Sequence, residues 1–511
     1  MVCCSGPAAP APAAPQWASD SSSVRLPAGP QYARGAVWRF FWGTHYRDIW
    51  AAPVTVPVLH LAAMGPGALV PVRAGGSYQS RTLRLRDATG QQFVLRSVDK
   101  DASAALPAGL RGLLGGLMKD QTSAGLPYGA YPAARLAAAA GVYHTQPRLV
   151  YLPDDPALGA FRAGYANALY LLEERAEGDQ RGRACFGNSP AVVSTRDRLT
   201  ALGQRALSHP EARAYLRARL LDMWLGDWSR REDQWRWASF PSPGGPRYLP
   251  IPRDRDQAFF RFDDGLVTRV VAWFVPKYQS FHATIFPGAV DGLSTTARAL
   301  DRTLLATLSA EDYRQEADSL RRRLTDAVIA EALHTVPAEV RTAVAARLAP
   351  RLRSRRAQLG AAARQYYQLL AREAWLVGTD GPERFVVGTD GPGRVRVVVK
   401  AIRAFKADST VAVRVYDDHD TRQVELYGLG GNDLFELHGL GKSATLIHLY
   451  GGAGHTQVIG ASLESEKNVV WHVNPNSPAV LPPAGLTAKP DAQPERTATA
   501  AAWRQRYNLR D

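Results

Sequence analysis

The sequence contains little cysteine and no long apolar segment, and both features limit the class of protein. Its 3 cysteines are an adjacent pair, Cys3 and Cys4, in a Pro/Ala-rich start, and an isolated Cys185. This pattern encodes neither a disulfide framework nor a zinc site. No apolar run is long enough to span a bilayer, and the first residues lack the basic start and apolar core of a signal peptide. We therefore expect no transmembrane segment and no signal peptide in this chain, whose opening is typical of a linker inside a longer protein.

Acidic residues are outnumbered, because 62 Lys plus Arg face 47 Asp plus Glu and give a formal net charge of +15. An excess of this sign favours anionic partners such as nucleotides, phosphates or membrane headgroups. The basic residues are scattered along the chain and are not massed in one tract, so we do not expect a nucleic-acid partner. The composition does not define an oligomeric state.

Changes in composition and in hydrophobic periodicity along the 511 residues divide the chain into segments. Both ends are rich in Ala and Pro and poor in residues that build a core. Near Leu376 the spacing of apolar residues changes to every second position, which is typical of strands. The expected segments are a disordered linker (1–30), an α+β domain (31–375) with an N-terminal lobe (about 31–175) and a C-terminal lobe (about 176–375), a β-rich domain (376–475) and a disordered tail (476–511).

Local patterns predict several elements of the α+β domain. Alternating apolar residues around an Asp87–Gly90 turn predict a hairpin over Thr82–Arg86 and Gln92–Val98. Ser309 with Asp312 forms a capping-box pattern at the start of a long helix that reaches Val328. The remaining predicted elements are strands at Arg148–Leu152, Ala168–Glu173 and Arg247–Phe262, and helices near Leu106–Lys119, Pro132–Ala140, Thr195–Leu207, Glu211–Leu225 and 337–373 with a kink at Pro350.

A polar cluster at Gly226–Trp235, followed by the acidic stretch Ile251–Phe259, carries the strongest chemical signal. The order of helix, polar loop and strand with acids is typical of kinases. Phosphoryl transfer needs an acid near the attacking hydroxyl, a metal ligand a few residues later and a second metal-binding acid on an adjoining strand. These roles could be filled by the Asp227/Ser229 region, Gln234 and Asp254.

After these motifs, the sequence resembles a known family: the kinase-like domain of large, Bacteroidetes-type bacterial envelope proteins. That family is distantly similar to HipA, to phosphatidylinositol 3- and 4-kinases and to Golgi casein kinases. The resemblance covers about residues 31–473 and implies a two-lobed protein-kinase-like α+β domain followed by a small all-β domain, a sandwich or a short β-roll. It also implies a location outside the cytoplasm or at the outer membrane, with membrane or envelope proteins as partners. The motifs that carry it are Gly43–Trp50, Gly75–Ser80, Phe93–Asp101, Leu172–Arg175, Gly226–Gln234 and Pro252–Phe259.

The resemblance also implies a site for ATP with magnesium or manganese. Glycines let backbone N–H groups approach phosphate oxygens, and a cation on the following strand anchors the phosphates. Either Arg96 or Lys100 could be this cation, and Glu173 with Glu174 is either the hinge between the lobes or a surface acidic pair. The implied residues are Gly75, Gly76 and Gln79 in the phosphate-covering loop, Arg96 and Lys100 as anchors, Glu173 and Glu174 at the hinge, and Gln234, Asp254 and Asp256 at the metal.

The polar loop departs from the Asp-Arg-His-x-x-Asn pattern of the related kinases, because Ser229 and Arg231 replace the first Asp and the His. A serine does not accept a proton as a carboxylate does. Asp227 lies two residues upstream, which moves a carboxylate by roughly 6 Å along an extended chain. The sequence therefore favours a degenerate, nucleotide-binding pseudokinase. An active phosphotransferase and a structural adaptor without nucleotide are the alternatives.

Other motifs suggest metal chemistry less strongly. Gly226-Asp227 is typical of metallophosphatases, but the companion His motifs are absent. Gly428–Phe435 and Gly451–His455 are similar to a calcium-binding β-roll repeat, but Thr456 stands where a second Asp is needed. We therefore interpret the two glycine-rich segments as turns between strands, and we expect that the β-rich domain does not require calcium. The acids around His419 are interpreted as a solvated turn, and the tryptophans of Trp224–Trp237 as packing.

Overall fold

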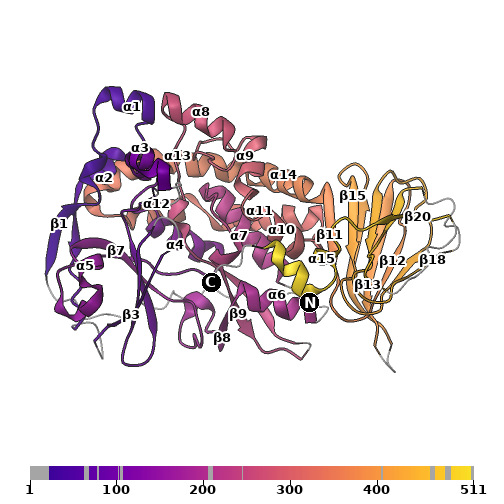
Figure 1. Ribbon diagram of the computed structural model, residues 1–511. Helices are drawn as coiled ribbons and strands as arrows, with labels where there is room; N and C mark the ends of the chain where they lie inside the picture. The colour runs from indigo at the N-terminus through magenta and orange to yellow at the C-terminus, as the bar shows by residue number, and fades with distance from the viewer. Residues whose placement is uncertain are drawn as a thin grey trace.

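The computed structural model describes residues 22–62, 68–76, 80–101, 103, 108–204, 211–243, 245–403, 407–460, 467–477 and 485–507. A strand-rich lobe, a helical lobe and a β domain follow one another across the molecule (Figure 1). Among the residues described, no helix combines the length and the apolarity needed to cross a membrane. The two-lobed α+β domain with a small all-β domain after it, as predicted from the sequence, is confirmed.

A five-stranded sheet forms the N-terminal lobe. Its predicted hairpin is confirmed: Oδ1 of Asp87 accepts hydrogen bonds from the backbone N–H groups of Thr89 and Gln91, both at 2.9 Å. Gly90 closes the turn with a φ of 87°, which favours glycine. In spatial order the strands are β3 (Val70–Gly75), β4 (Thr82–Arg86), β5 (Gln92–Ser97), β7 (Ala168–Glu174) and β6 (Arg148–Leu152).

The helical lobe is built around α7 (Ala212–Leu225), whose side chains are almost all buried. The predicted capping box is confirmed, because Oδ2 of Asp312 accepts from the N–H of Ser309 at 2.8 Å and the serine hydroxyl accepts from the N–H of Asp312. The helix ends at Arg323, however, and Thr325 caps a separate one. The other helices include α4 (Ala130–Ala140), α6 (Thr195–Gln204), α8 (Leu266–Phe274), α9 (Pro287–Ser294), α10 (Arg298–Leu304), α11 (Ala310–Arg323), α12 (Asp326–His334), α13 (Ala338–Ala357) and α14 (Leu359–Ala371).

A small antiparallel sheet adjoins the polar loop, and the end of its last strand differs from the prediction. The sheet consists of β8 (Ala191–Ser194), β9 (Trp235–Phe240) and β10 (Arg247–Pro252) in the order β10-β9-β8. The strand predicted over Arg247–Phe262 therefore ends at Pro252, because Asp254 turns the chain with a φ of 57°. This turn directs the acids that follow β10 toward the N-terminal lobe.

The β domain consists of two five-stranded sheets around one apolar core. From β15 to β19 the chain alternates between the sheets, and strands within each sheet pair in parallel in this part, as in a β-roll. Its glycine turns stack directly, since a Cβ on Gly454 would lie 1.3 Å from the carbonyl oxygen of Gly431. The sheets, in spatial order, are β11 (Glu373–Val377), β15 (Gln423–Tyr427), β17 (Leu446–Tyr450), β19 (Val469–Val473) and β20 (Thr487–Pro490), and β14 (Ser409–Asp417), β13 (Arg394–Ala401), β12 (Glu383–Thr389), β16 (Leu434–Leu437) and β18 (Gln457–Gly460).

Both ends of the chain contain more structure than the sequence predicts. Ser23–Pro27, placed in the linker, forms β1 and pairs with β2 (Pro53–Pro57). In the expected tail, the described residues include β20, α15 (Pro494–Thr497) and α16 (Ala500–Trp503).

Two aromatic residues explain why the C-terminal segment packs against the rest of the protein. Trp503 packs edge-to-face on Trp375 and lies 4.4 Å from the ring centroid of Tyr427. The hydroxyl of Tyr507 lies 2.6 Å from Oγ1 of Thr303, in the helical lobe. Burial of these rings gives an Ala-rich segment enough apolar contact to overcome its chain entropy.

Candidate functional site

The structure brings three of the predicted site residues together between the two lobes. Arg96 lies near the end of β5, Glu173 lies on the neighbouring strand β7, and Asp254 follows β10 in the helical lobe. A guanidinium nitrogen of Arg96 contacts Oδ1 of Asp254 and lies 3.9 Å from Oε2 of Glu173. The predicted phosphate anchor Arg96 and the predicted metal ligand Asp254 are thus direct neighbours.

Electrostatics inside this group keep the arginine and the aspartate charged. Burial alone lowers the pKa of Arg96, but the charges of Asp254 and Glu173 outweigh it and raise the pKa above its ordinary value. Burial raises the pKa of Asp254, and the cations around it, led by Arg96, reverse the effect and lower it. For Glu173 burial prevails and its pKa is raised.

Lys100 makes a second bridge between the lobes. Its Nζ lies 2.5 Å from Oδ2 of Asp256, two residues beyond Asp254. The sequence left open whether Arg96 or Lys100 is the phosphate anchor. In the structure each of the two cations neutralises one of the two acids that were predicted to bind a metal.

The two predicted hinge acids point in different directions. Successive side chains of a strand face opposite sides of a sheet. Glu173 faces Arg96, whereas Oε1 of Glu174 lies 2.6 Å from Nη1 of Arg183. Both carboxylates are buried, so the alternative of a solvated surface pair is wrong.

The predicted phosphate-covering loop is described only in part. Gly75 ends β3, and Gly76 has a φ of 141°, with the carbonyl oxygen of Ser80 only 2.3 Å from the place of a Cβ. Gly76 is therefore required by the turn itself. Gln79 lies outside the described residues, and the role of all three in holding phosphate stays a prediction.

The polar loop after α7 is held by contacts among its own residues. The carboxylate of Asp227 is fully buried, contacts the guanidinium of Arg230 and accepts the N–H of Ser229 at 3.1 Å. Nε2 of Gln234 lies 3.2 Å from the hydroxyl oxygen of Ser229, and Oε1 of Gln234 accepts the N–H of Arg231 at 3.0 Å. The catalytic roles of Asp227 and Ser229 and the metal role of Gln234 stay predictions. In this arrangement the side chains of all three residues hold the loop in its conformation through contacts within the loop.

Beneath the loop lies a buried ionic network that the sequence analysis missed. Asp222 of α7 forms an ion pair with Nε of Arg230 at 3.0 Å and accepts a hydrogen bond from Nε of Arg255 at 3.1 Å, while Arg219 pairs with Asp301 at 3.0 Å. The available signal was a pair of charges three residues apart, Arg219 and Asp222, inside an otherwise apolar stretch of helix. Burial and the nearby charge of Asp222 raise the pKa of Asp227 to about 7 although Arg230 opposes the shift.

A largely apolar cavity of about 170 Å³ adjoins the two ion pairs. Its charged lining residues are Arg96, Lys100 and Asp256, and aromatic rings, among them that of Trp228, form much of the apolar part. The ring of Trp228 packs edge-to-face on Phe260 and Tyr278, as its predicted packing role requires. The cavity is smaller than the roughly 300–1,000 Å³ typical of ligand pockets.

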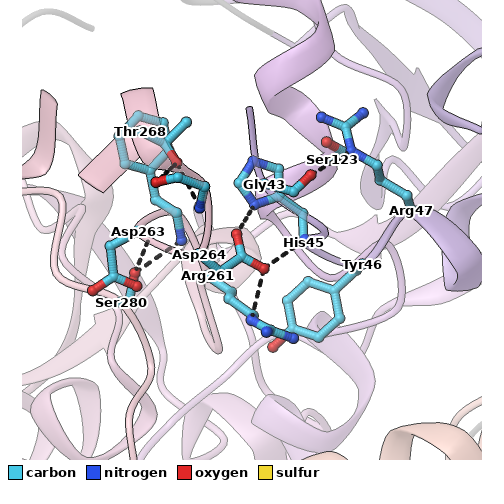
Figure 2. Close-up of polar contacts among 12 residues, drawn as sticks. Gly43, His45, Tyr46, Arg47, Ser123, Arg261, Asp263, Asp264, Thr268 and Ser280 are labelled. Atoms are coloured by element: carbon cyan, nitrogen blue, oxygen red, sulfur yellow. Dashed lines mark hydrogen bonds and ion pairs between the residues drawn. The ribbon is translucent and has the colours of Figure 1, made fainter. Parts of the chain in front are cut away.

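The Gly43–Trp50 motif, one of those that carry the family resemblance, links segments distant in sequence (Figure 2). The hydroxyl of Tyr46 donates to the carbonyl oxygen of Phe259 at 2.7 Å, next to the acidic turn. Arg47 pairs with Asp120 at 2.6 Å, at the end of α3 (Ala108–Asp120). Nδ1 of His45 lies 2.7 Å from Oδ1 of Asp264. The motif therefore supports the segment that follows Asp256.

Comparisons with known proteins give distant similarities only. No protein-family model and no curated protein matches the sequence. Among solved structures, the chain is similar to the Helicobacter pylori proinflammatory kinase CtkA, with 13% identity and a TM-score of 0.31, over 60% of this chain and 97% of that one.

Two further solved structures are similar at lower scores. One is a chain of the Shewanella oneidensis MR-1 toxin-antitoxin HipA, HipB and operator DNA complex, with 14% identity and a TM-score of 0.23, over 58% of this chain and 65% of that one. The other is the Rio2 kinase complex with ADP/Mg²⁺ and phosphoaspartate from Chaetomium thermophilum, with 15% identity and a TM-score of 0.19, over 53% and 73%. Identities and scores this low transfer no activity, so the site is interpreted from its own residues.

Proposed function

We propose that this chain contains a kinase-like domain that binds ATP with a divalent cation weakly and transfers its phosphate poorly or not at all. The observation that carries the proposal is the meeting of Arg96 with Asp254 and of Lys100 with Asp256 between the lobes. Two cations and two carboxylates at one place are the groups that phosphates and a hard metal ion require.

The residues fit such a ligand only if they exchange partners. Arg96 and Lys100 would hold phosphate oxygens, and the carboxylates of Asp254 and Asp256, released from these cations, would hold magnesium or manganese. When bound, the nucleotide supplies the phosphoryl group and the metal neutralises its charge. The exchange costs two ion pairs, which supports weak binding.

Poor transfer is supported by the polar loop. Ser229 carries no carboxylate and is hydrogen-bonded to Gln234, and the buried Asp227 is held by Arg230. At the loop position where the related kinases have a carboxylate base, this chain therefore has only the hydroxyl of Ser229. Positioning and charge stabilisation contribute most to phosphoryl transfer, so losing the base lowers turnover without abolishing binding.

A structural adaptor without nucleotide is the second candidate. It is favoured by the same two ion pairs, since they satisfy the acids without any ligand. The motif resemblance further leads us to propose that the chain works as part of a cell-envelope protein, outside the cytoplasm.

Labelled ATP with magnesium or manganese separates the candidates. We expect little phosphate transfer by the unmodified protein and a gain in Ser229→Asp, which restores the carboxylate. Strong turnover that disappears in Asp254→Asn would make the protein an active kinase. Asp154→Asn, in an exposed ion pair with Arg162, is the matched control and should behave as the unmodified protein.

A further inference from the structure

Large apolar side chains gather on the surface of two helices, α1 (Ala36–Trp42) and α8 (Leu266–Phe274). Trp273 and Phe274 are 85% and 79% exposed, and Val37 and Phe40 are 74% and 63% exposed. Eight of the thirteen exposed large apolar residues in the described part of the chain lie on these two helices. The helices pack against each other at the top edge of the molecule in Figure 1. An apolar patch of this kind on a protein surface marks an interaction site.

The charges on this patch, which we call the α1/α8 tip, have one sign. Each helix carries one arginine, Arg39 or Arg269, and neither carries an acid. The acids just before α8 are already paired: Asp264 with His45 and Arg261, and Asp263 with His282 at 2.7 Å. The tip therefore presents aromatic rings together with unopposed positive charge.

A joint at the base of the tip fixes the two helices to each other (Figure 2). The carboxylate of Asp264 accepts the N–H of His45 at 2.8 Å and lies 3.0 Å from Nε of Arg261. The backbones also touch, since a Cβ on Gly265 would lie 2.3 Å from the backbone nitrogen of Gly43. The tip is thus held in one arrangement before it meets a partner, which lowers the entropic cost of docking.

We propose that the α1/α8 tip docks on an anionic lipid surface, with its aromatic rings at the headgroup level and its arginines on lipid phosphates. Tryptophan and phenylalanine beside arginine are the composition of an interfacial membrane contact. Anionic headgroups complement Arg39 and Arg269. In a symmetric dimer formed through this patch, the arginines of the two copies would face each other near the two-fold axis. Their repulsion opposes that contact.

Co-sedimentation of the full chain with vesicles tests the proposal. We expect binding to phosphatidylcholine vesicles that contain about one third phosphatidylglycerol, and much weaker binding to phosphatidylcholine alone or in high salt. Trp273→Ser with Phe274→Ser should lower the partition coefficient about tenfold or more, because two large rings no longer enter the interface. Arg39→Gln with Arg269→Gln should remove the preference for anionic lipid.

Val413→Ser with Ile459→Ser is the matched control, because both residues are exposed apolar side chains of the β domain. This variant should bind vesicles as the unmodified protein does. Absence of vesicle binding, or equal binding by the Trp273→Ser/Phe274→Ser variant, overturns the proposal. Light scattering that finds a dimer which becomes a monomer in the tip variant also overturns it, because the occupant is then a second copy. None of these readouts depends on nucleotide binding.

Discussion

The ammonium group of Lys100 lies 2.5 Å from Oδ2 of Asp256, although 156 positions separate the two residues in the chain. The contact joins the segment after β5 to the turn after β10. Arg96 makes the parallel contact with Asp254. In the proposed function, a nucleotide with its metal ion binds here by exchanging partners with these four residues.

The Arg96–Asp254 pair should couple strongly in a double-mutant cycle. We expect Arg96→Met and Asp254→Asn each to lower the free energy of unfolding by about 2–4 kcal/mol, because each leaves a largely buried charge without its partner. The double variant should lose clearly less free energy of unfolding than the sum of the losses in the two single variants. Urea denaturation measures all three, and strictly additive losses would show that the contact is not energetically important. Asp154→Asn, in an exposed pair, should leave the midpoint unchanged.

Stability of the β domain should fall as the pH rises toward and above neutrality. Burial raises the pKa of Glu383 to about 7 and that of Asp433 to about 8, both above their ordinary values. The native state then binds more protons than the unfolded chain, so the stability they contribute is present below pH ~4 and is lost as the pH rises through the folded pKa values. Because one pKa unit corresponds to about 1.4 kcal/mol, we expect the two groups together to lower the free energy of unfolding by several kcal/mol between pH 5 and pH 9.

Thermal unfolding at several pH values checks this dependence. Asp433→Asn with Glu383→Gln should flatten the profile, because neither amide titrates. Asp390→Asn, at an exposed ion pair of the same domain, should leave the slope unchanged. A profile in which stability rises toward pH 9 contradicts the assignment of raised pKa values.

Gly265→Ala should destabilise the joint between α1 and α8. The added methyl group would meet the backbone of Phe41 and Gly43 within 3 Å, and backbone cannot move aside as a side chain does. We expect a loss of about 1–3 kcal/mol. Gly288→Ala in α9 is the control, since no atom lies within 4 Å of its Cβ position, and it should stabilise by up to about 1 kcal/mol. Equal effects of the two substitutions in chemical denaturation would refute the close-contact account.

Removing the ring of Trp503 should detach the C-terminal segment. Trp503→Ala loses buried contacts with Trp375 and Tyr427 and should cost about 3 kcal/mol. Trp273→Ala, at a ring that is almost fully exposed, should change stability by less than about 0.5 kcal/mol. Limited proteolysis near the C-terminus should accelerate only in the first variant. Resistance equal to that of the unmodified protein would mean that Trp503 does not hold the tail.

The sequence predicted the elements whose signals are local. The Asp87 turn and its alternating strands, and the Ser309 capping box, depend on residues a few positions apart, and both are confirmed. The tail was predicted wrongly because Trp503 and Tyr507 find their partners more than a hundred residues away or in another domain. Composition alone does not reveal such partners.

The candidate site was predictable in its residue types and not in its pairings. The motifs indicated Arg96, Lys100, Asp254 and Asp256, but no spacing rule predicts which cation meets which acid across two lobes. The network around Asp222 was missed because charged residues on a helix are usually exposed, and its burial depends on Arg230 and Arg255 arriving from other segments. Burial of charge is a property of the folded arrangement.

Calorimetric titration of the full chain with ATP, with and without magnesium or manganese, tests the central claim most directly. We predict weak, saturable binding that requires the divalent cation, is lost in Asp254→Asn and is retained in Asp154→Asn. Asp254 loses its metal-binding charge in the first variant, whereas the second changes an exposed pair away from the site. Absence of binding with every metal tested, or binding that persists unchanged in Asp254→Asn, would contradict the nucleotide site and leave the domain as a structural adaptor.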